Sequence, residues 1–391
     1  MIPRYEVRYS PIDLASAVLS LTRRDSEEFR AEIPGFPRDE FELLAVRRGR
    51  EALFVLLKSL ALAPGSRVGV PLYVCSCVPH AVKEAGLQPI YIDADPATFG
   101  LDLEDLAIKS HSIEALVVVY TLGRPMDFPA IARLLPGKPI IEDCAHAIGS
   151  SFSQRPLGSW GTASFFTFGF FKPVSAGGGG LIVSRDRHVV RKAQRLIGSS
   201  PRESVTQTLT HSITCLAKGV AFTNPAYSIL SRFKPAMDDD GPNTTPVSRV
   251  ISDALRMRPV DKAIIERYLA ITPNNQGIEE FWKKLRERIP DGWQIPAEPN
   301  CGVWNHFMFA VQAPNPASCN GAVRSLRAQG VSAAKLFPNC VREMQAAGYE
   351  GDCPKSERLA SVTLMIPCHG ALSDSQRTRI LKAISGSLVT L

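Results

Sequence analysis

The 391-residue sequence lacks the features of membrane, exported and nucleic-acid-binding proteins. Its apolar runs fall short of the ~18 residues that cross a bilayer, and the first residues carry charges where a secretory signal peptide is apolar. The 45 Lys and Arg against 38 Asp and Glu give a net charge of +7, which is spread along the chain. We therefore expect no membrane insertion, no export and no nucleic-acid partner.

The nine cysteines also lack the spacing of a structural site. They are odd in number, they include no CxxC pair, and no histidines stand at zinc-finger spacing from them. We interpret them as reduced thiols of a cytoplasmic protein, and we expect no metal site. A chain of this length buries roughly three quarters of its surface on folding, so its core needs neither disulfides nor metal.

The composition is that of a globular enzyme. Apolar residues make up 45% of the chain and charged residues 21%, which excludes a disordered or fibrous protein. At ~150 residues per domain, the length suggests two or three domains. We expect a large α/β domain over residues 1–250, which includes an N-terminal helical segment, and a smaller α+β domain over residues 251–391.

Short apolar runs alternate with helical patterns between residues 45 and 185. This rhythm is typical of βαβ units in a mostly parallel sheet flanked by helices. We expect strands at Arg67–Val70, Pro89–Ile92, Ala115–Tyr120, Pro139–Ile141, Ala163–Phe168 and Leu181–Ser184. We expect helices at Arg50–Leu62, Val78–Ala85, Leu103–Lys109 and Pro129–Leu134, and the first of these is apolar almost all round.

The second half of the chain is less regular. A basic helix is expected from Arg187 to about Ser200, followed by a proline-containing excursion at Phe222–Pro246. A helical pattern resumes at Val247–Leu269, and strands are expected near Phe307–Val311 and Ser361–Met365. Because long segments near a site tend to carry function, we expect the excursion to influence substrate choice.

A first candidate site is the segment Pro139-Ile-Ile-Glu-Asp-Cys-Ala-His146. An apolar strand runs directly into Glu142 and Asp143, and open α/β sheets bind ligands at the carboxyl ends of their parallel strands. The alternative is an aspartate that caps the following helix. The segment alone does not decide between the two.

A second candidate is Lys172, which follows an aromatic strand and precedes four glycines. Apolar surroundings favour the neutral amine, and only the neutral amine attacks a carbonyl to form a Schiff base. An isolated lysine in this setting is first of all a snorkelling side chain at a sheet edge. The glycines fit any tight turn or close backbone approach.

Together the two segments supply what pyridoxal phosphate requires. The cofactor needs a Schiff-base lysine, an acid that keeps its ring nitrogen protonated, and a cradle for its phosphate. Lys172 and Asp143 meet the first two needs on successive strands. The turn at Gly49 can form the cradle, since the N–H groups and dipole of a helix N-terminus favour an anion. Positive charge and a hydroxyl group would come from Arg47, Arg48, Arg50 and Thr167.

At these residues the sequence resembles the pyridoxal-phosphate-dependent nucleotide-sugar aminotransferases of the DegT/DnrJ/StrS type, which are fold-type-I transferases like aspartate aminotransferase. The strongest signal is Glu142-Asp-Cys-Ala-His146 followed by Lys172, 29 residues after Asp143. The resemblance covers nearly the whole chain, and its specific motifs are confined to residues 49–180. Other matching segments are Gly49-Arg-Glu-Ala-Leu53, Pro64-Gly-Ser-Arg-Val-Gly-Val-Pro71, Gly86-Leu-Gln-Pro-Ile-Tyr-Ile-Asp93 and Gly123-Arg-Pro-Met-Asp127.

The resemblance implies roles for the matching residues. Lys172 corresponds to the Schiff-base lysine and Asp143 to the partner of the ring nitrogen. His146 corresponds to a side chain against the cofactor ring or its phenolic oxygen, with a plain helix-surface imidazole as the alternative. Further cofactor contacts are implied at Gly49, Arg50 and Thr167, and at Asn243, which reaches the partner subunit's phosphate unless it is a plain loop residue.

The sequence also departs from the family pattern. Cys75 occupies the position at which many members stack an aromatic side chain on the cofactor ring, so the stacking is lost or moved to Tyr73. The Glu expected after the lysine is missing at Gly178, and a strand-end His is replaced near Tyr120. The Arg expected after Asn243 is a Thr. These departures lie around the substrate and the outer contacts of the cofactor, so they question the identity of the substrate more than that of the cofactor. The family's dehydratase branch replaces the lysine with His, so the retained Lys172 argues against that branch.

The resemblance implies a homodimeric aminotransferase with active sites shared between subunits. The expected donor is an amino acid, L-glutamate, and the expected acceptor is the keto group of a nucleotide-linked sugar. One alternative keeps the cofactor and changes the reaction to elimination, decarboxylation or aldol-type cleavage, because the same lysine and aspartate serve those reactions. Another alternative is a catalytically silent binding or regulatory dimer, motivated by the missing aromatic.

Overall fold

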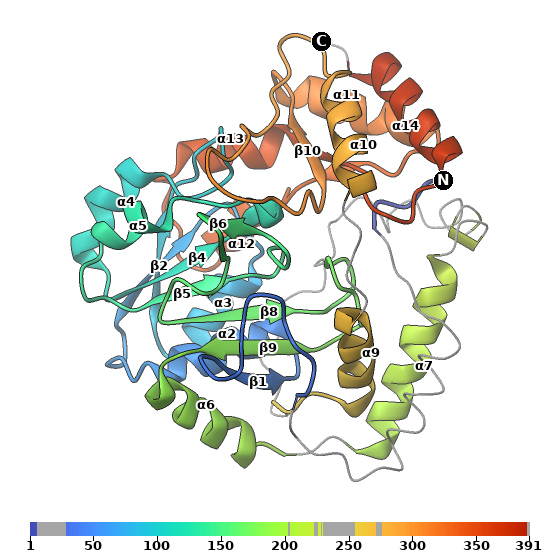
Figure 1. The fold of residues 1–391 in the computed structure, drawn as a ribbon. Helices are drawn as coiled ribbons and strands as arrows, with labels where there is room; N and C mark the ends of the chain where they lie inside the picture. The colour runs from blue at the N-terminus through green and yellow to red at the C-terminus, as the bar shows by residue number, and fades with distance from the viewer. Residues whose placement is uncertain are drawn as a thin grey trace.

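The computed structural model describes residues 1–5, 29–201, 204–222, 226, 227, 229, 255–270 and 276–388. A large sheet and its helices occupy one side of the molecule, and a small sheet with five helices occupies the other (Figure 1). The expected N-terminal helical segment, most of the excursion at 222–246 and the first part of the helical pattern at 247–269 lie outside the described residues. Among the described residues no helix combines the length and the apolar character needed to cross a bilayer.

The large sheet has seven strands in the order β1-β9-β8-β5-β4-β2-β3. All pairings from β8 to β3 are parallel, whereas β9 runs antiparallel to both β8 and β1. The expected mostly parallel sheet is therefore confirmed, with an antiparallel edge that the sequence pattern did not reveal. The strands are β1 (Glu42–Val46), β2 (Arg67–Pro71), β3 (Gln88–Ile92), β4 (Ala115–Val119), β5 (Ile140–Asp143), β8 (Ala163–Thr167) and β9 (Gly180–Ser184).

Helices cover this sheet because its strands are apolar on both faces. In β4, Val117 belongs to the hydrophobic cluster of one face, and its neighbours Leu116 and Val118 belong to the cluster of the other. The helix expected at Arg50–Leu62 is α2 (Gly49–Ser59), and it is buried as its composition predicts. The other expected helices are α3 (Cys77–Glu84), α4 (Leu103–Lys109), α5 (Phe128–Arg133) and α6 (Arg187–Ser199).

The small sheet is antiparallel, with the order β10-β12-β11. Its strands β10 (Phe309–Gln312) and β12 (Thr363–Ile366) lie one or two residues later than expected. Ser361 was wrongly placed in a strand, since it lies in the helix α13 (Pro354–Val362). The remaining elements of this part are β11 (Ala334–Lys335), α10 (Gln276–Arg286), α11 (Pro316–Ala328), α12 (Cys340–Gln345) and α14 (Asp374–Ser387).

Two helices connect the large sheet to the rest of the chain. The sequence analysis missed α7 (Val205–Ala221), which begins at a capping box formed by Ser204 and Gln207. The second helix is α9 (Pro259–Ala270), whose Val260 and Ile264 belong to a hydrophobic cluster of the large sheet. We therefore propose a boundary between the two domains after α9 rather than at residue 250.

Short elements complete the fold at the two edges of the large sheet where its strands begin and end. The 3-10 turns η1 (Ser110–Ser112) and η2 (Thr121–Gly123) precede and follow β4. The hairpin of β6 (Ser151–Phe152) and β7 (Arg155–Pro156) follows β5. The turn η2 lies next to the site described below.

Candidate active site

A cavity of about 560 Å³ lies where the large sheet, α7 and the small domain meet. Arg47, expected near the phosphate, does not line it, whereas Arg48 does, together with the seven expected catalytic and cofactor-binding residues that the structure describes. These seven are Gly49, Arg50, Cys75, Asp143, His146, Thr167 and Lys172. Asn243, expected at the partner subunit's phosphate, lies outside the described residues.

The sheet topology explains this convergence. The strand β5 ends at Asp143 and the neighbouring strand β8 ends at Thr167, and the two strands pair in parallel. Parallel strands end at the same edge of a sheet, where open α/β folds bind ligands. Asp143 and Thr167, 24 positions apart in the chain, therefore face the same cavity.

Asp143 is a buried carboxyl group in the cavity wall. Its Oδ1 accepts a hydrogen bond of 2.9 Å from the backbone N–H of Ala145, and turns rather than a helix follow it. The helix-capping alternative is therefore wrong. Burial raises the pKa of Asp143 to about 6, although the Ala145 N–H and the positive charge of Lys172 oppose this shift. A buried carboxyl group of this kind suits a positively charged ligand atom.

Glu142 lies on the opposite face of the same strand and has a structural role. Its carboxylate accepts hydrogen bonds from the Tyr120 hydroxyl at 2.6 Å and from three backbone N–H groups at 2.6–2.8 Å. The three N–H groups belong to Gly158, Trp160 and Gly161. The Glu142 side chain thereby holds the loop that leads into β8, while its neighbour Asp143 faces the cavity.

The lysine and the histidine of the motif contact each other. Lys172 Nζ lies 3.0 Å from His146 Nε2, and the backbone N–H of Leu122 donates to His146 Nδ1 at 3.3 Å. Burial, aided by the charge of Lys172, lowers the pKa of His146 well below its usual value, so the imidazole is neutral. Because Nδ1 accepts, the imidazole proton is on Nε2 and points at the lysine. The imidazole Nε2 therefore faces the lysine amine at hydrogen-bond distance.

Residues of the small domain hold His146 in place. Asn305 Nδ2 donates to the backbone carbonyls of His146 at 2.7 Å and Ile148 at 2.9 Å. Trp304 Nε1 donates to the carbonyl of Leu122 at 2.9 Å, so the residue whose N–H contacts His146 Nδ1 is itself held in place. The helix-surface alternative for His146 is wrong, since this side chain is buried in the cavity wall.

The N-terminus of α2 faces the same cavity. Its N-cap residue Arg48 is extended and makes no side-chain cap, so the Arg48 side chain does not occupy the N–H groups of the first turn, and Arg48, Gly49 and Arg50 all line the cavity. Gly49 packs so closely on Thr167 that an added Cβ would lie 2.6 Å from the Thr167 Cβ. An N–H array, a hydroxyl group and the Arg50 side chain therefore lie together, which is the arrangement that binds a phosphate.

The four glycines allow close approach rather than a turn alone. A Cβ at Gly180 would lie 2.6 Å from the carbonyl of Arg48, because β9 begins directly beside the start of α2. A Cβ at Gly178 would lie 2.4 Å from the Asp261 carboxylate. The run thus brings the segment after Lys172 against both the phosphate cradle and α9.

Cys75 lines the cavity, but Tyr73 does not replace the missing aromatic. The Tyr73 ring is buried against Phe99 and Phe337, and its hydroxyl donates to the carbonyl of Leu336 at 2.9 Å. It is therefore directed away from the cavity. The expectation that ring stacking moves to Tyr73 is not supported.

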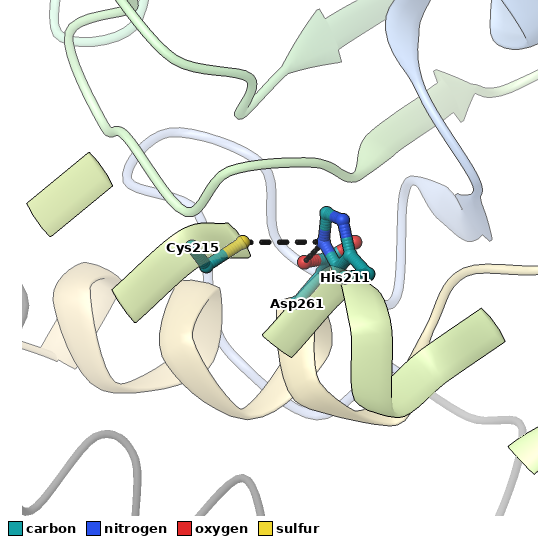
Figure 2. A group of neighbouring side chains, drawn as sticks. All are labelled: His211, Cys215 and Asp261. Carbon is teal, nitrogen blue, oxygen red and sulfur yellow. Dashed lines mark hydrogen bonds and ion pairs between the residues drawn. The ribbon is translucent and has the colours of Figure 1, made fainter. Parts of the chain in front are cut away.

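The sequence analysis missed a pair at the α7 side of the cavity. His211 of α7 lines the cavity and lies 2.8 Å, Nε2 to Oδ1, from the buried Asp261 of α9 (Figure 2). Cys215, one turn later, lies 3.4 Å from the same imidazole nitrogen. The three side chains are of metal-binding types. However, the Arg258 guanidinium lies 3.6 Å from Asp261, and burial raises the pKa of Cys215 to about 12, so we interpret the group as a hydrogen-bonded pair.

Basic side chains from several elements complete the cavity. Arg48 and Arg50 come from the start of α2, Lys218 comes from α7, and Lys335 comes from β11. Only the first two could be anticipated, because their motif was recognised. The capping box Ser204-x-x-Gln207 was the signal that could have revealed α7 and its cavity-facing side chains.

The residues present fit pyridoxal phosphate on observations of this structure. The cradle at Gly49 fits a phosphate, the buried carboxyl group of Asp143 fits a protonated ring nitrogen, and the lysine amine fits the aldehyde. All three face one cavity. The cradle, the carboxyl group and the amine can therefore contact one bound molecule.

Known proteins of similar sequence include aminotransferases, which agrees with the fit of the cavity to pyridoxal phosphate. GDP-perosamine synthase of Escherichia coli O157:H7 is 26% identical over 258 residues, which are 63% of this chain and 68% of that protein. The UDP-N-acetyl-3-dehydro-alpha-D-glucosamine 3-aminotransferase of Acidithiobacillus ferrooxidans is 32% identical over 38% of this chain and 41% of its own length. The chain thus spans about two thirds of the first relative and less than half of the second.

The fold is shared with solved structures over the whole chain. The aminotransferase TlmJ from Streptoalloteichus hindustanus superposes with a TM-score of 0.79 at 22% identity, covering 99% of both chains. The model of the DegT/DnrJ/EryC1/StrS aminotransferase family matches residues 15–223, which is more than half of the chain. The chain therefore belongs to the DegT/DnrJ/EryC1/StrS aminotransferase family and is a pyridoxal-phosphate-dependent transaminase.

Proposed function

We propose that this enzyme transfers an amino group from an amino acid, L-glutamate, to the keto group of a nucleotide-linked sugar. The main observation behind the proposal is that Lys172, Asp143 and the start of α2 line one cavity. The same cavity is also lined by Lys218 and Lys335. Relatives named for GDP-, UDP- and dTDP-linked sugars support this class of acceptor. The two substrates are small molecules.

The side chains of this cavity have distinct tasks in the proposed reaction. When bound, pyridoxal phosphate supplies the electron sink that stabilises negative charge at the substrate carbon. Lys172 carries the proton at Nζ to and from that carbon as acid and base. Asp143 holds the ring-nitrogen proton, and the neutral His146 orients Lys172 through their 3.0 Å contact. Gly49, Arg50 and Thr167 hold the phosphate.

The cationic lining supports an acceptor with phosphate groups. Arg50 belongs to the cofactor cradle, whereas Lys218 and Lys335 come from α7 and the small domain and lie beyond it in sequence and fold. A diphosphate carries negative charge that such lysines attract as point charges. These two residues are therefore the proposed contacts of the nucleotide diphosphate.

We propose that the enzyme is a homodimer that pairs through α7. The face of α7 opposite His211 and Lys218 exposes four apolar side chains at helical spacing: Leu209, Ile213, Leu216 and Val220. The same helix contributes His211, Thr214 and Lys218 to the cavity. Pairing there buries the apolar face and packs a second subunit against the outer side of the helix that lines the cavity. We propose that the enzyme acts in the cytoplasm, because its nine free cysteines stay reduced in a reducing compartment.

The oligomeric state tests this interface. Ile213→Glu places a charge in the exposed face of α7 and is expected to shift the protein from dimer to monomer in sedimentation velocity. Ile108→Glu is the matched control, because Ile108 is exposed on α4, remote from α7. A dimer that survives Ile213→Glu unchanged would place the interface elsewhere.

The absorbance of the purified enzyme tests the reaction. Addition of L-glutamate is expected to abolish the visible band of the lysine-bound cofactor, and addition of a keto-sugar nucleotide is expected to restore it. Lys172→Ala should lack the band, whereas Lys83→Ala, at an exposed position of α3, should keep it. A band that no amino donor changes would favour elimination, decarboxylation or aldol-type chemistry instead, and a protein that never binds the cofactor would favour a silent dimer.

A further inference from the structure

Two cysteines lie side by side in the wall of the cavity. Cys75 follows β2, and Cys77 is the first residue of α3. Their sulfur atoms are 2.8 Å apart, and both residues line the cavity together with Lys172 and Arg50. A disulfide bond is 2.03–2.05 Å long, so these sulfurs need to approach by only about 0.8 Å to form one.

The surroundings activate one of the two thiols. The hydrogen bond shared with Cys77 lowers the pKa of Cys75 to about 7 against the effect of burial, with help from the Cys77 backbone N–H and the charges of Lys172 and Arg50. The same hydrogen bond and burial raise the pKa of Cys77 well above its usual value. The pair therefore combines a thiol of lowered pKa with a thiol of raised pKa at the N-terminus of a helix, which is the setting of reactive cysteines.

None of the other seven cysteines combines a lowered pKa with a neighbouring cysteine. Burial raises the pKa of six of them, and these six are Cys144, Cys215, Cys319, Cys340, Cys353 and Cys368. Cys301 is exposed at the surface. Of all nine, Cys75 and Cys77 alone are a pair within the cofactor cavity.

We propose that Cys75 and Cys77 are a redox modification site at which a disulfide-type oxidant, such as oxidised glutathione, produces an intramolecular disulfide. The Cys75 thiolate attacks one sulfur of the oxidant, forming a mixed disulfide and releasing one thiolate. Cys77 then loses its proton and attacks the Cys75 sulfur, which releases the second thiolate. The two cysteines lose two electrons, the oxidant gains them, and both released thiolates take up the protons that the cysteines have lost.

Because Cys75 and Cys77 lie in the wall of the cavity, we expect bound cofactor to protect them from oxidation. This part of the inference rests on the proposed function, since the cavity has to be the cofactor site. Both sulfurs belong to residues of the cavity wall, so occupancy of the cavity limits access of an oxidant to them. Oxidation of the cofactor-free enzyme is therefore expected to be about tenfold faster, or more, than oxidation of the loaded enzyme.

Mass spectrometry of the wild-type enzyme tests the chemistry directly. The reduced enzyme is incubated with oxidised glutathione and digested with trypsin, which releases residues 68–83 as one peptide containing both cysteines. The expected product is this peptide lighter by two hydrogens, and dithiothreitol should reverse the change. A peptide that stays reduced, while glutathione adds only to Cys301, would overturn the proposal.

Single substitutions separate the two roles. Cys77→Ser should stop the reaction at the mixed disulfide, so that glutathione remains on Cys75, and Cys75→Ser should leave Cys77 unmodified. Equal reaction of the two variants would contradict the assignment of Cys75 as the attacking thiolate. Cys301→Ser is the matched control and should leave the oxidation of peptide 68–83 unchanged.

The two hypotheses can fail separately. The disulfide is detected by mass, so it does not depend on transamination, and the response of the absorbance band to glutamate does not depend on the thiols. A disulfide that forms equally fast with and without pyridoxal phosphate would overturn the placement of the pair beside the cofactor.

Discussion

The buried carboxyl group of Asp143 is expected to destabilise the enzyme when the cofactor is absent. Burial raises its pKa to about 6 from an ordinary value of 3.8. This difference of about two pKa units corresponds to about 3 kcal/mol of unfolding free energy. Because the native state binds the proton more tightly, the stability is fully present below about pH 4 and is lost as the pH rises through about 6.

The substitution Asp143→Asn removes the charge and keeps the shape. The Asn side-chain oxygen can still accept the hydrogen bond from the Ala145 N–H. The cofactor-free variant is therefore expected to be more stable than the cofactor-free wild type at pH 7, by up to about 3 kcal/mol, and equally stable near pH 4. Pyridoxal phosphate should reverse this order, because only the wild-type carboxylate pairs with its ring-nitrogen proton.

Urea unfolding followed by circular dichroism at several pH values measures the effect. The control is Asp127→Asn, at the exposed N-cap of α5, where the Asp127 side chain accepts a hydrogen bond of 2.9 Å from the Ala130 N–H. Asn caps a helix as well as Asp, so this variant should follow the wild-type curve. Parallel stability curves for the wild type and Asp143→Asn between about pH 4 and 7 would refute the reasoning, since burial would then impose no penalty on the charge.

Three further substitutions test the cradle and the histidine. Gly49→Ala should weaken pyridoxal phosphate binding about tenfold or more and cost about 1–3 kcal/mol, since its Cβ would meet Thr167 at 2.6 Å. In a binding titration Gly198→Ala, whose Cβ meets nothing within 4 Å, should match the wild type. His146→Leu should slow the rise of the cofactor band after mixing about tenfold or more, and His146→Gln should slow it less. Trp304→Phe should lower the unfolding free energy by about 1 kcal/mol, and an unchanged thermal transition would contradict that role.

Much of the fold was predictable because the large sheet is buried on both faces. The apolar runs around Val68, Val117 and Ile182 can only be central strands, and their ends agree with the structure within a few residues. Edge elements carry a weaker signal. The strand β1 has no continuous buried run, and its pairing with β9 is antiparallel, which no local pattern encodes.

The site was predictable where one motif carried several functional residues. Asp143, His146 and Lys172 lie within 30 residues of each other, and the parallel sheet brings them to one edge. The pair of His211 and Asp261 was not predictable, because it depends on the packing of α7 against α9 across 50 residues of sequence. Likewise, only the tertiary structure shows that Tyr73 turns away from the cavity while Cys75 faces it.

The hydrogen bonds from Trp304 and Asn305 limit how this chain can be divided or recombined. Lys172 and Asp143, from the half of the chain that holds the large sheet, line the cavity, yet the position of His146 beside them depends on two residues some 160 positions later in the sequence. A truncated large domain would retain Lys172 and Asp143 but lose the support of the imidazole beside the lysine. A chimera with a relative's C-terminal half would need an indole N–H donor and a side-chain amide in the same places. The segment at 304–305 therefore has to evolve together with the loop it holds.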